Sequence, residues 1–215
     1  MSFLNQLKSQ ASALQGQQQS RQAALAENTQ RAEQACKTVQ YYLNELAQQL
    51  NVLAPPGPKL TLDGKTPWPA MKLMNFRVDT RRKMLRDKEV TDYIAMGWQI
   101  LPQMGAPVGG SVTVNFPPDW ERVEKRLALG SVKHERKEVR HPEKNTLQAF
   151  RYEYLTESRG YITVTPNHDE GQIGFRLANV TGFEVQNVSR AATEIQTDVL
   201  DELAKLLVGQ PNRFV

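Results

Sequence analysis

The side chains in this chain that could carry catalysis or bind a metal are few and scattered. The sequence has three histidines and one cysteine. His134 and His141 are seven residues apart, so on one strand they would point to opposite faces and could not share a metal ion. His168, Asp169 and Glu170 could offer three ligands from one turn, although ordinary solvated turns have the same composition. We therefore expect neither a metal nor another cofactor.

The glycine-rich segment 105–111 lacks the context of a phosphate-binding loop. It leads into an expected strand, whereas phosphate loops lie at the start of a helix and usually add Lys followed by Ser or Thr. No serine stands in a nucleophile elbow, and the sequence pairs no histidine with the cysteine. The sequence therefore predicts a protein that is not an enzyme.

Two basic clusters are the remaining candidates for ligand chemistry. Both lie on expected strands and both are interspersed with Asp and Glu, as is usual for solvated faces. Aromatic residues do not alternate with them in the way typical of single-stranded nucleic-acid sites. The net charge of +4 is too low to argue for nucleic acid by itself. Phosphate or nucleic-acid binding therefore ranks last among the predicted functions, and its candidate residues are Arg81, Arg82, Lys83, Arg136 and Lys137.

A heptad pattern in the first part of the chain predicts a long helix over residues 1–53. From Leu25 to Leu53, apolar or small residues recur at alternating steps of four and three, which is typical of a coiled coil. A helix of about fifty residues spans about 75 Å, whereas the rest of the chain would form a globule under about 45 Å across. The helix must therefore project, bend back or pack against a second copy.

The N-terminal part of this helix is expected to be its weaker half. The heptad rhythm continues back to Leu4, but Gln18 and Arg21 occupy two of its positions. Gly16 lies just before them and costs roughly 1 kcal/mol relative to Ala in a helix. We therefore expect the arm to be weak or hinged near residues 16–20.

Self-association is the function that the sequence favours, because an exposed apolar stripe invites a partner. We predict a non-enzymatic homo-oligomer, or a protein that recruits a helical partner. An alternative is that the stripe from Val39 to Leu53 packs on the chain's own sheet, and the two arrangements can coexist. The candidate interface residues are Leu25, Ala32, Cys36, Val39, Leu43, Leu46, Leu50 and Leu53.

The remainder of the chain predicts an antiparallel α+β domain. Residues 54–58, Ala-Pro-Pro-Gly-Pro, end the helix and form a linker, because proline cannot continue a helix. Over residues 59–215, short alternating runs separated by turn residues are typical of antiparallel strands. A short helix is expected to begin at Pro117, and a longer one to cover residues 190–208. The simplest fold is a curved antiparallel sheet with helices against its concave face.

A space between this sheet and the final helix would be a second kind of site. A cavity there could bind an apolar small molecule, and this is the alternative function that we predict. The candidate lining residues, each of which also suits an ordinary core, are Trp98, Phe150, Tyr152, Tyr154 and Phe175.

Composition and the N-terminal sequence bound the location of the protein. A single cysteine argues against a disulfide framework and for a reducing compartment. The first residues lack the basic and apolar regions of a secretory signal. No run approaches the roughly 18 apolar residues of a membrane span. We expect a cytoplasmic protein that does not insert into the membrane.

Overall fold

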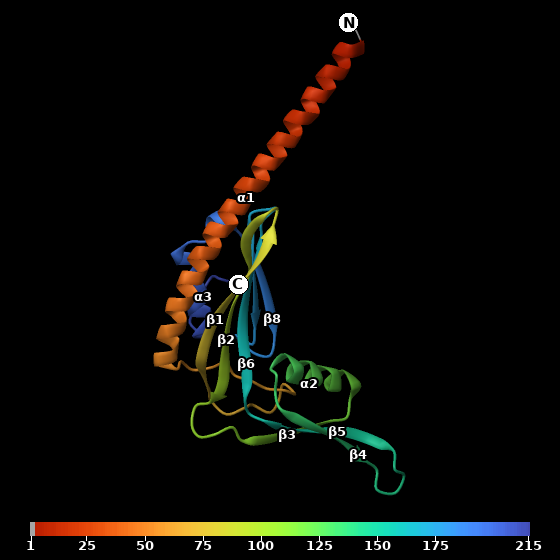
Figure 1. Cartoon of the computed structure of the whole chain (residues 1–215). Coiled ribbons are helices and arrows are strands. Elements are labelled where there is room, and N and C mark those ends of the chain that lie inside the picture. Colours follow the sequence, from red (N-terminus) through yellow and green to blue (C-terminus); the bar gives the residue numbers. More distant parts are fainter. Residues whose placement is uncertain (1–2) are drawn as a thin grey trace.

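The computed structural model describes residues 3–215 and shows a long helix beside antiparallel sheets (Figure 1). The helix, α1 (Phe3–Leu53), is continuous through residues 16–20, where we expected a weak or hinged segment. Its N-terminal part projects beyond the rest of the molecule (Figure 1). The predicted start of the helix at residue 1 lies outside the described residues. The mixed α+β fold with a long N-terminal helix is confirmed.

The main sheet has five strands in the order β1-β2-β6-β7-β8, and all neighbouring strands are antiparallel. Its strands are β1 (Met71–Leu85), β2 (Lys88–Pro102), β6 (Ser158–Asn167), β7 (Gln172–Ala178) and β8 (Val185–Ala191). Alternate residues of β2, from Ile94 to Ile100, are buried, as a half-buried strand requires. The buried stripe of α1 belongs to the same hydrophobic core.

A second, smaller sheet has three antiparallel strands in the order β3-β5-β4. These strands are β3 (Gly109–Val114), β5 (Leu147–Leu155) and β4 (His134–Arg140). Our expectation of a single sheet is therefore wrong. The reason is that residues 103–108 carry the chain out of the main sheet before β3 begins, and residues 156–157 return it at β6. The helix α2 (Pro117–Leu129) buries Val123 and Leu127.

The last helix is shorter than we predicted. β8 runs to Ala191, and a 3-10 turn, η1 (Ala192–Glu194), precedes α3 (Thr197–Leu207). Ser189, just before the predicted start, pairs with Gly174 in the β7–β8 ladder. The backbone groups of residues 185–191 are thus bonded to a neighbouring strand, and this long-range pairing outweighs the local helical pattern that begins at Arg190.

The proline-rich segment 54–58 ends α1 and continues along the edge of the main sheet. The backbone N–H of Gly57 donates to the carbonyl of Met71 at 2.7 Å, and that of Leu73 donates to the carbonyl of Pro55 at 2.8 Å. These bonds cover the first part of the β1 edge and fix the C-terminal end of α1 against the sheet.

Candidate functional site

The helix α1 has two parts that differ in what covers their apolar stripe. We call residues 32–50 the covered half, because their stripe packs on the chain's own domain, mainly on β1 and β2. We call residues 3–28 the arm, whose large apolar side chains from Phe3 to Leu14 are 45% to 72% exposed. On a helix of 3.6 residues per turn, the mean direction of the arm's apolar side chains lies within roughly 30° of that of the covered half's buried side chains. One stripe therefore runs along both parts.

The structure divides the eight predicted interface residues between these surroundings. Leu25 and Leu46 are partly exposed, and Leu53 is 70% exposed. The other five are not available at the surface of a single chain, because the sheet occupies that face of α1. These five are Ala32, Cys36, Val39, Leu43 and Leu50. Self-association stays a prediction, and the exposed stripe that could support it lies nearer the N-terminus.

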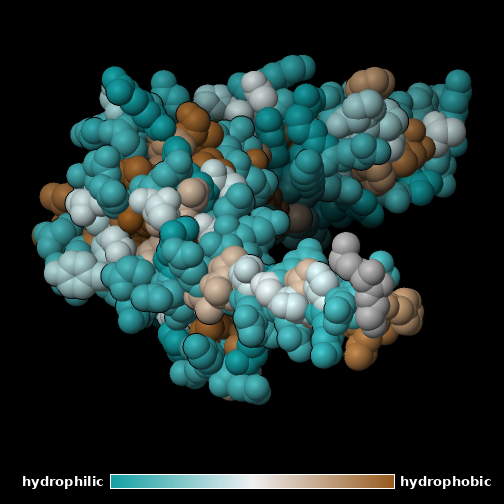
Figure 2. All heavy atoms as spheres, turned by 90° about the horizontal axis from the view of Figure 1, so that it is seen from above, coloured by the Kyte–Doolittle hydropathy of each residue, from teal (hydrophilic) through white to brown (hydrophobic). Residues whose placement is uncertain are grey.

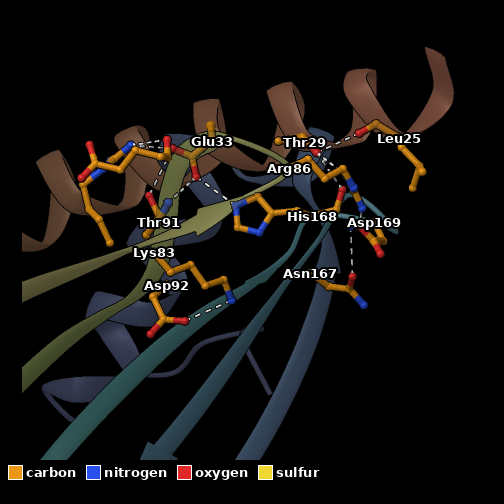
Figure 3. A network of polar contacts seen from close by, with 12 residues as sticks. Leu25, Thr29, Glu33, Lys83, Arg86, Thr91, Asp92, Asn167, His168 and Asp169 are labelled. Atoms are coloured by element: carbon orange, nitrogen blue, oxygen red, sulfur yellow. Dashed lines mark hydrogen bonds and ion pairs between the residues drawn. The ribbon is translucent and has the colours of Figure 1, made fainter. Parts of the chain in front are cut away.

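A polar network marks the point where α1 meets the ends of two hairpins (Figure 3). Glu33 of α1 accepts a hydrogen bond from the backbone N–H of Thr91 at 2.7 Å, and its Oε1 lies 3.0 Å from Nε2 of His168. His168 belongs to the β6–β7 turn and is only 4% exposed. Arg86 of the β1–β2 turn forms an ion pair with Asp169 beside it. We call this set of contacts the junction.

Two titratable groups near the junction are strongly shaped by their surroundings. Burial raises the pKa of Glu33, but hydrogen bonds from His168 and Thr91 outweigh burial and leave this pKa below its usual value. The ionised carboxylate can thus bind both hairpin ends to α1. Burial raises the pKa of the nearby Cys36 thiol to about 12, so this thiol is neutral at physiological pH and is not an activated nucleophile.

A groove of about 700 Å³ lies beside the junction, between α1 and the tip of the β1–β2 hairpin. Its apolar walls come from Leu25 of α1 and from Leu85 and Val90 of the hairpin. The charged residues that line it are Glu27, Glu33, Arg86, Lys88 and Glu89. The groove thus lies where the bare stripe of the arm meets the sheet. Seen from above, apolar residues are also at the surface near the N-terminal end of the arm (Figure 2).

The residues predicted to bind anions are not brought together. Arg81, Arg82 and Lys83 lie on β1, whereas Arg136 and Lys137 lie on β4 of the other sheet. Each of the five lies within salt-bridge distance of at least one carboxylate. Such pairs are usual on solvated strands, and the two sheets assemble no joint basic surface from these residues.

The aromatic residues predicted to line one cavity are also divided between the sheets. Trp98 and Phe175 lie in the main sheet. Phe175 packs edge-to-face on Phe214, with ring centroids 5.2 Å apart. The residues that lie in β5 of the small sheet are Phe150, Tyr152 and Tyr154. The five residues therefore do not share the face of one sheet, and an apolar ligand site stays a prediction.

Sequence reasoning did not find the junction. From the sequence, the turn at residues 168–170 was only a possible source of metal ligands. In the structure, His168 is buried against Glu33. These two residues are 135 positions apart in the chain, and no local pattern indicates such a contact. Within residues 3–215, no group of three or more His, Cys, Asp or Glu residues could hold a metal ion.

No family model, curated protein or solved structure matches this chain. The part of the chain that the structure describes has no helix long and apolar enough to cross a membrane, and this includes α1. The geometry of α1 and its junction is therefore the basis for the function.

Proposed function

We propose that this protein is a non-enzymatic interaction protein that self-associates through the arm of α1. The single observation that carries the proposal is the exposed apolar stripe of the arm. The large members of this stripe are Phe3, Leu4, Leu7, Leu14 and Leu25. An exposed apolar stripe on a projecting helix is typical of an interaction surface.

The arm also needs a partner for its own stability. Isolated helices are marginal in water, because most helical stability in proteins comes from the packing of an apolar face. The arm contains Gly16, which adds roughly 1 kcal/mol of cost relative to Ala. A second helix that covers the stripe would supply the packing that the sheet supplies to the covered half.

The polar side of the arm favours the association of like copies. Between residues 3 and 26 the sequence has Lys8 and Arg21 as its only charged residues, and its polar positions are mostly glutamine and serine. Two copies can therefore lie side by side with little charge repulsion, and the apolar stripe supplies the attraction.

The proposal is tested by placing charges on the stripe. A triple variant, Leu4→Asp, Leu7→Asp and Leu14→Asp, should raise the dissociation constant of the oligomer by at least about 100-fold, since that factor needs only about 2.8 kcal/mol. Light scattering coupled to size-exclusion chromatography measures the mass. At a protein concentration where both chains are monomeric, the melting temperature of the domain should not change, because these side chains lie outside the core.

The matched control carries three aspartates on the opposite face of the arm, at Asn5, Ser9 and Ser12. It changes the net charge by the same amount, and we expect it to keep the wild-type mass. Equal loss of association in both variants would show that charge rather than the stripe is responsible. A wild-type chain that is monomeric at every concentration would refute self-association itself.

A further inference from the structure

We infer that two copies of this chain pair their arms antiparallel, so that the N-terminal end of each arm reaches the groove beside the junction of the other copy. The inference rests on the proposed self-association and adds to it an orientation, a register and a docking site. It follows from three features of α1: the face that its stripe shares with the sheet, the position of Arg21, and the length of the arm.

A parallel pair is blocked by the sheets. The stripe of the arm and the buried stripe of the covered half lie on one face of α1, and from Ala32 onward the chain's own sheet fills that face. Two packed helices have axes about 8–10 Å apart, and a single packed sheet layer already needs about 10 Å. Two sheets cannot fit between such helices. Both helices would have to bend sharply near residue 28, whereas α1 runs straight there (Figure 1).

Arg21 also disfavours the parallel arrangement. It occupies a stripe position, so a parallel in-register pair would place the two guanidinium groups at one level of the interface. No acidic residue lies between residues 3 and 26 to neutralise them. In the antiparallel pair described next, Arg21 lies opposite Ala11 of the second copy, and the two arginines are about 15 Å apart along the helix axis.

The antiparallel pair leaves each domain beyond the N-terminus of the other arm. The arms overlap along their whole length when Phe3 lies opposite Thr29, the residue just after the arm of the second copy, which gives about 27 paired residues over about 40 Å. This register keeps stripe positions opposite each other. It pairs Leu7 with Leu25 of the second copy, and Leu14 with Gln18 of the second copy. On its own arm, Leu25 has no large apolar stripe residue between it and Leu14. In this register it gains Leu7 of the second copy as a partner.

The groove is placed to receive the end of the arm in this register. Leu25, Leu85 and Val90 form its apolar walls, and Leu4 of the second copy arrives beside them. The groove is lined by three carboxylates and two cations. The N-terminus of a helix carries a partial positive charge, and the first turn of α1 has no acidic residue to cancel it. Shape and charge therefore both suit an arm from a second copy.

Disulfide crosslinking tests the orientation. In a Cys36→Ala background, the variants Leu7→Cys and Leu25→Cys are mixed, with one of them carrying a mass tag, and oxidised mildly. The mixed crosslink should form at least about tenfold faster than either homodimeric one, because a disulfide needs Cα atoms within about 7 Å. Two Leu7 positions would be about 27 Å apart in the antiparallel pair. Ser9→Cys, on the opposite face, is the control and should not crosslink.

The outcomes separate this inference from the proposal on which it rests. Homodimeric crosslinks that form as fast as the mixed one would overturn the antiparallel orientation while leaving self-association intact. If the wild-type chain is an oligomer but the mixed Leu7→Cys and Leu25→Cys variants fail to crosslink, the proposed register is wrong. A monomeric wild-type chain would remove both the inference and the proposed function.

A second pair of variants tests the groove. Leu85→Lys places a charge on the groove wall and should raise the dissociation constant of the oligomer by about tenfold, which corresponds to about 1.4 kcal/mol. Met84→Lys adds the same charge at the neighbouring position of β1, which is 67% exposed and does not line the groove, and should leave the constant unchanged. Equal constants for the two variants would show that the arm does not reach the groove.

Discussion

The covered half and the arm of α1 carry the same stripe in opposite surroundings. The buried positions nearest the arm are the small residues Ala32, Ala35 and Cys36, and the larger Leu43 and Leu50 follow further along. The arm carries leucines at an exposed surface instead. A heptad pattern therefore identifies the face of a helix that will be covered, but not what covers it.

The largest expected contrast between the two halves is in domain stability. Leu43 is fully buried, so Leu43→Ala should lower the free energy of unfolding by about 2–5 kcal/mol through lost burial and the remaining cavity. Leu14 is 60% exposed, and Leu14→Ala should change the free energy of unfolding by no more than about 0.5 kcal/mol. Urea denaturation at low protein concentration measures both. Similar losses would mean that the arm packs on the domain in solution.

A smaller contrast is expected at the boundary between the halves. Glu33→Gln removes a carboxylate that is hydrogen-bonded to Thr91 and His168, and should cost about 1–3 kcal/mol of unfolding free energy at neutral pH. Glu27 lies in the arm and pairs only with Arg31 among described residues, so Glu27→Gln should cost less than about 0.5 kcal/mol.

The cost of Glu33→Gln should also depend on pH. The folded-state pKa of Glu33 is lowered, so its contribution to stability is fully present above the unfolded value of about 4.3 and is lost as the pH falls through the folded value. The difference between wild type and Glu33→Gln should therefore shrink as the pH is lowered from about 5 to 3. A difference that stays constant over this range would contradict the role of the ionised carboxylate.

The smallest effect is expected within the arm itself. Gly16→Ala should stabilise the helix locally by about 1 kcal/mol, and beyond the adjoining helix backbone a methyl group there meets no described atom within 4 Å. Amide hydrogen exchange in the arm should slow, while the unfolding free energy of the domain stays the same. Gln17→Ala, at the next position, should have little effect on exchange, because Gln and Ala have similar helix propensities.

Elements set by local chemistry could be predicted from the sequence. The turn between β1 and β2 is made by Arg86 and Asp87, which have φ angles of 50° and 61°, as a type I′ hairpin turn requires. The alternation in β2 and the start of α2 at Pro117 were confirmed as well. The charged strand β4 lies at an edge of the small sheet, where charged side chains discourage pairing with a further strand.

Features set by long-range pairing could not be predicted. The division into two sheets depends on which strands pair with β3 and β5. The late start of α3 depends on the β7–β8 ladder. The junction likewise joins Glu33 to a turn far along the chain. Local periodicity carries no information about such partners, because several pairings satisfy the same alternation of apolar residues.

The unbroken course of α1 through the junction turns the arm into a lever. Phe3 lies thirty positions before Glu33, at a distance of about 45 Å along the axis. A tilt of about 10° about Glu33 would thus displace the tip by about 8 Å. Asn28 donates a further hydrogen bond to the carbonyl of Asp169 at 2.8 Å, and together with Arg86 it resists such rocking. A few polar contacts at the junction therefore determine how precisely the N-terminal end of the arm is positioned.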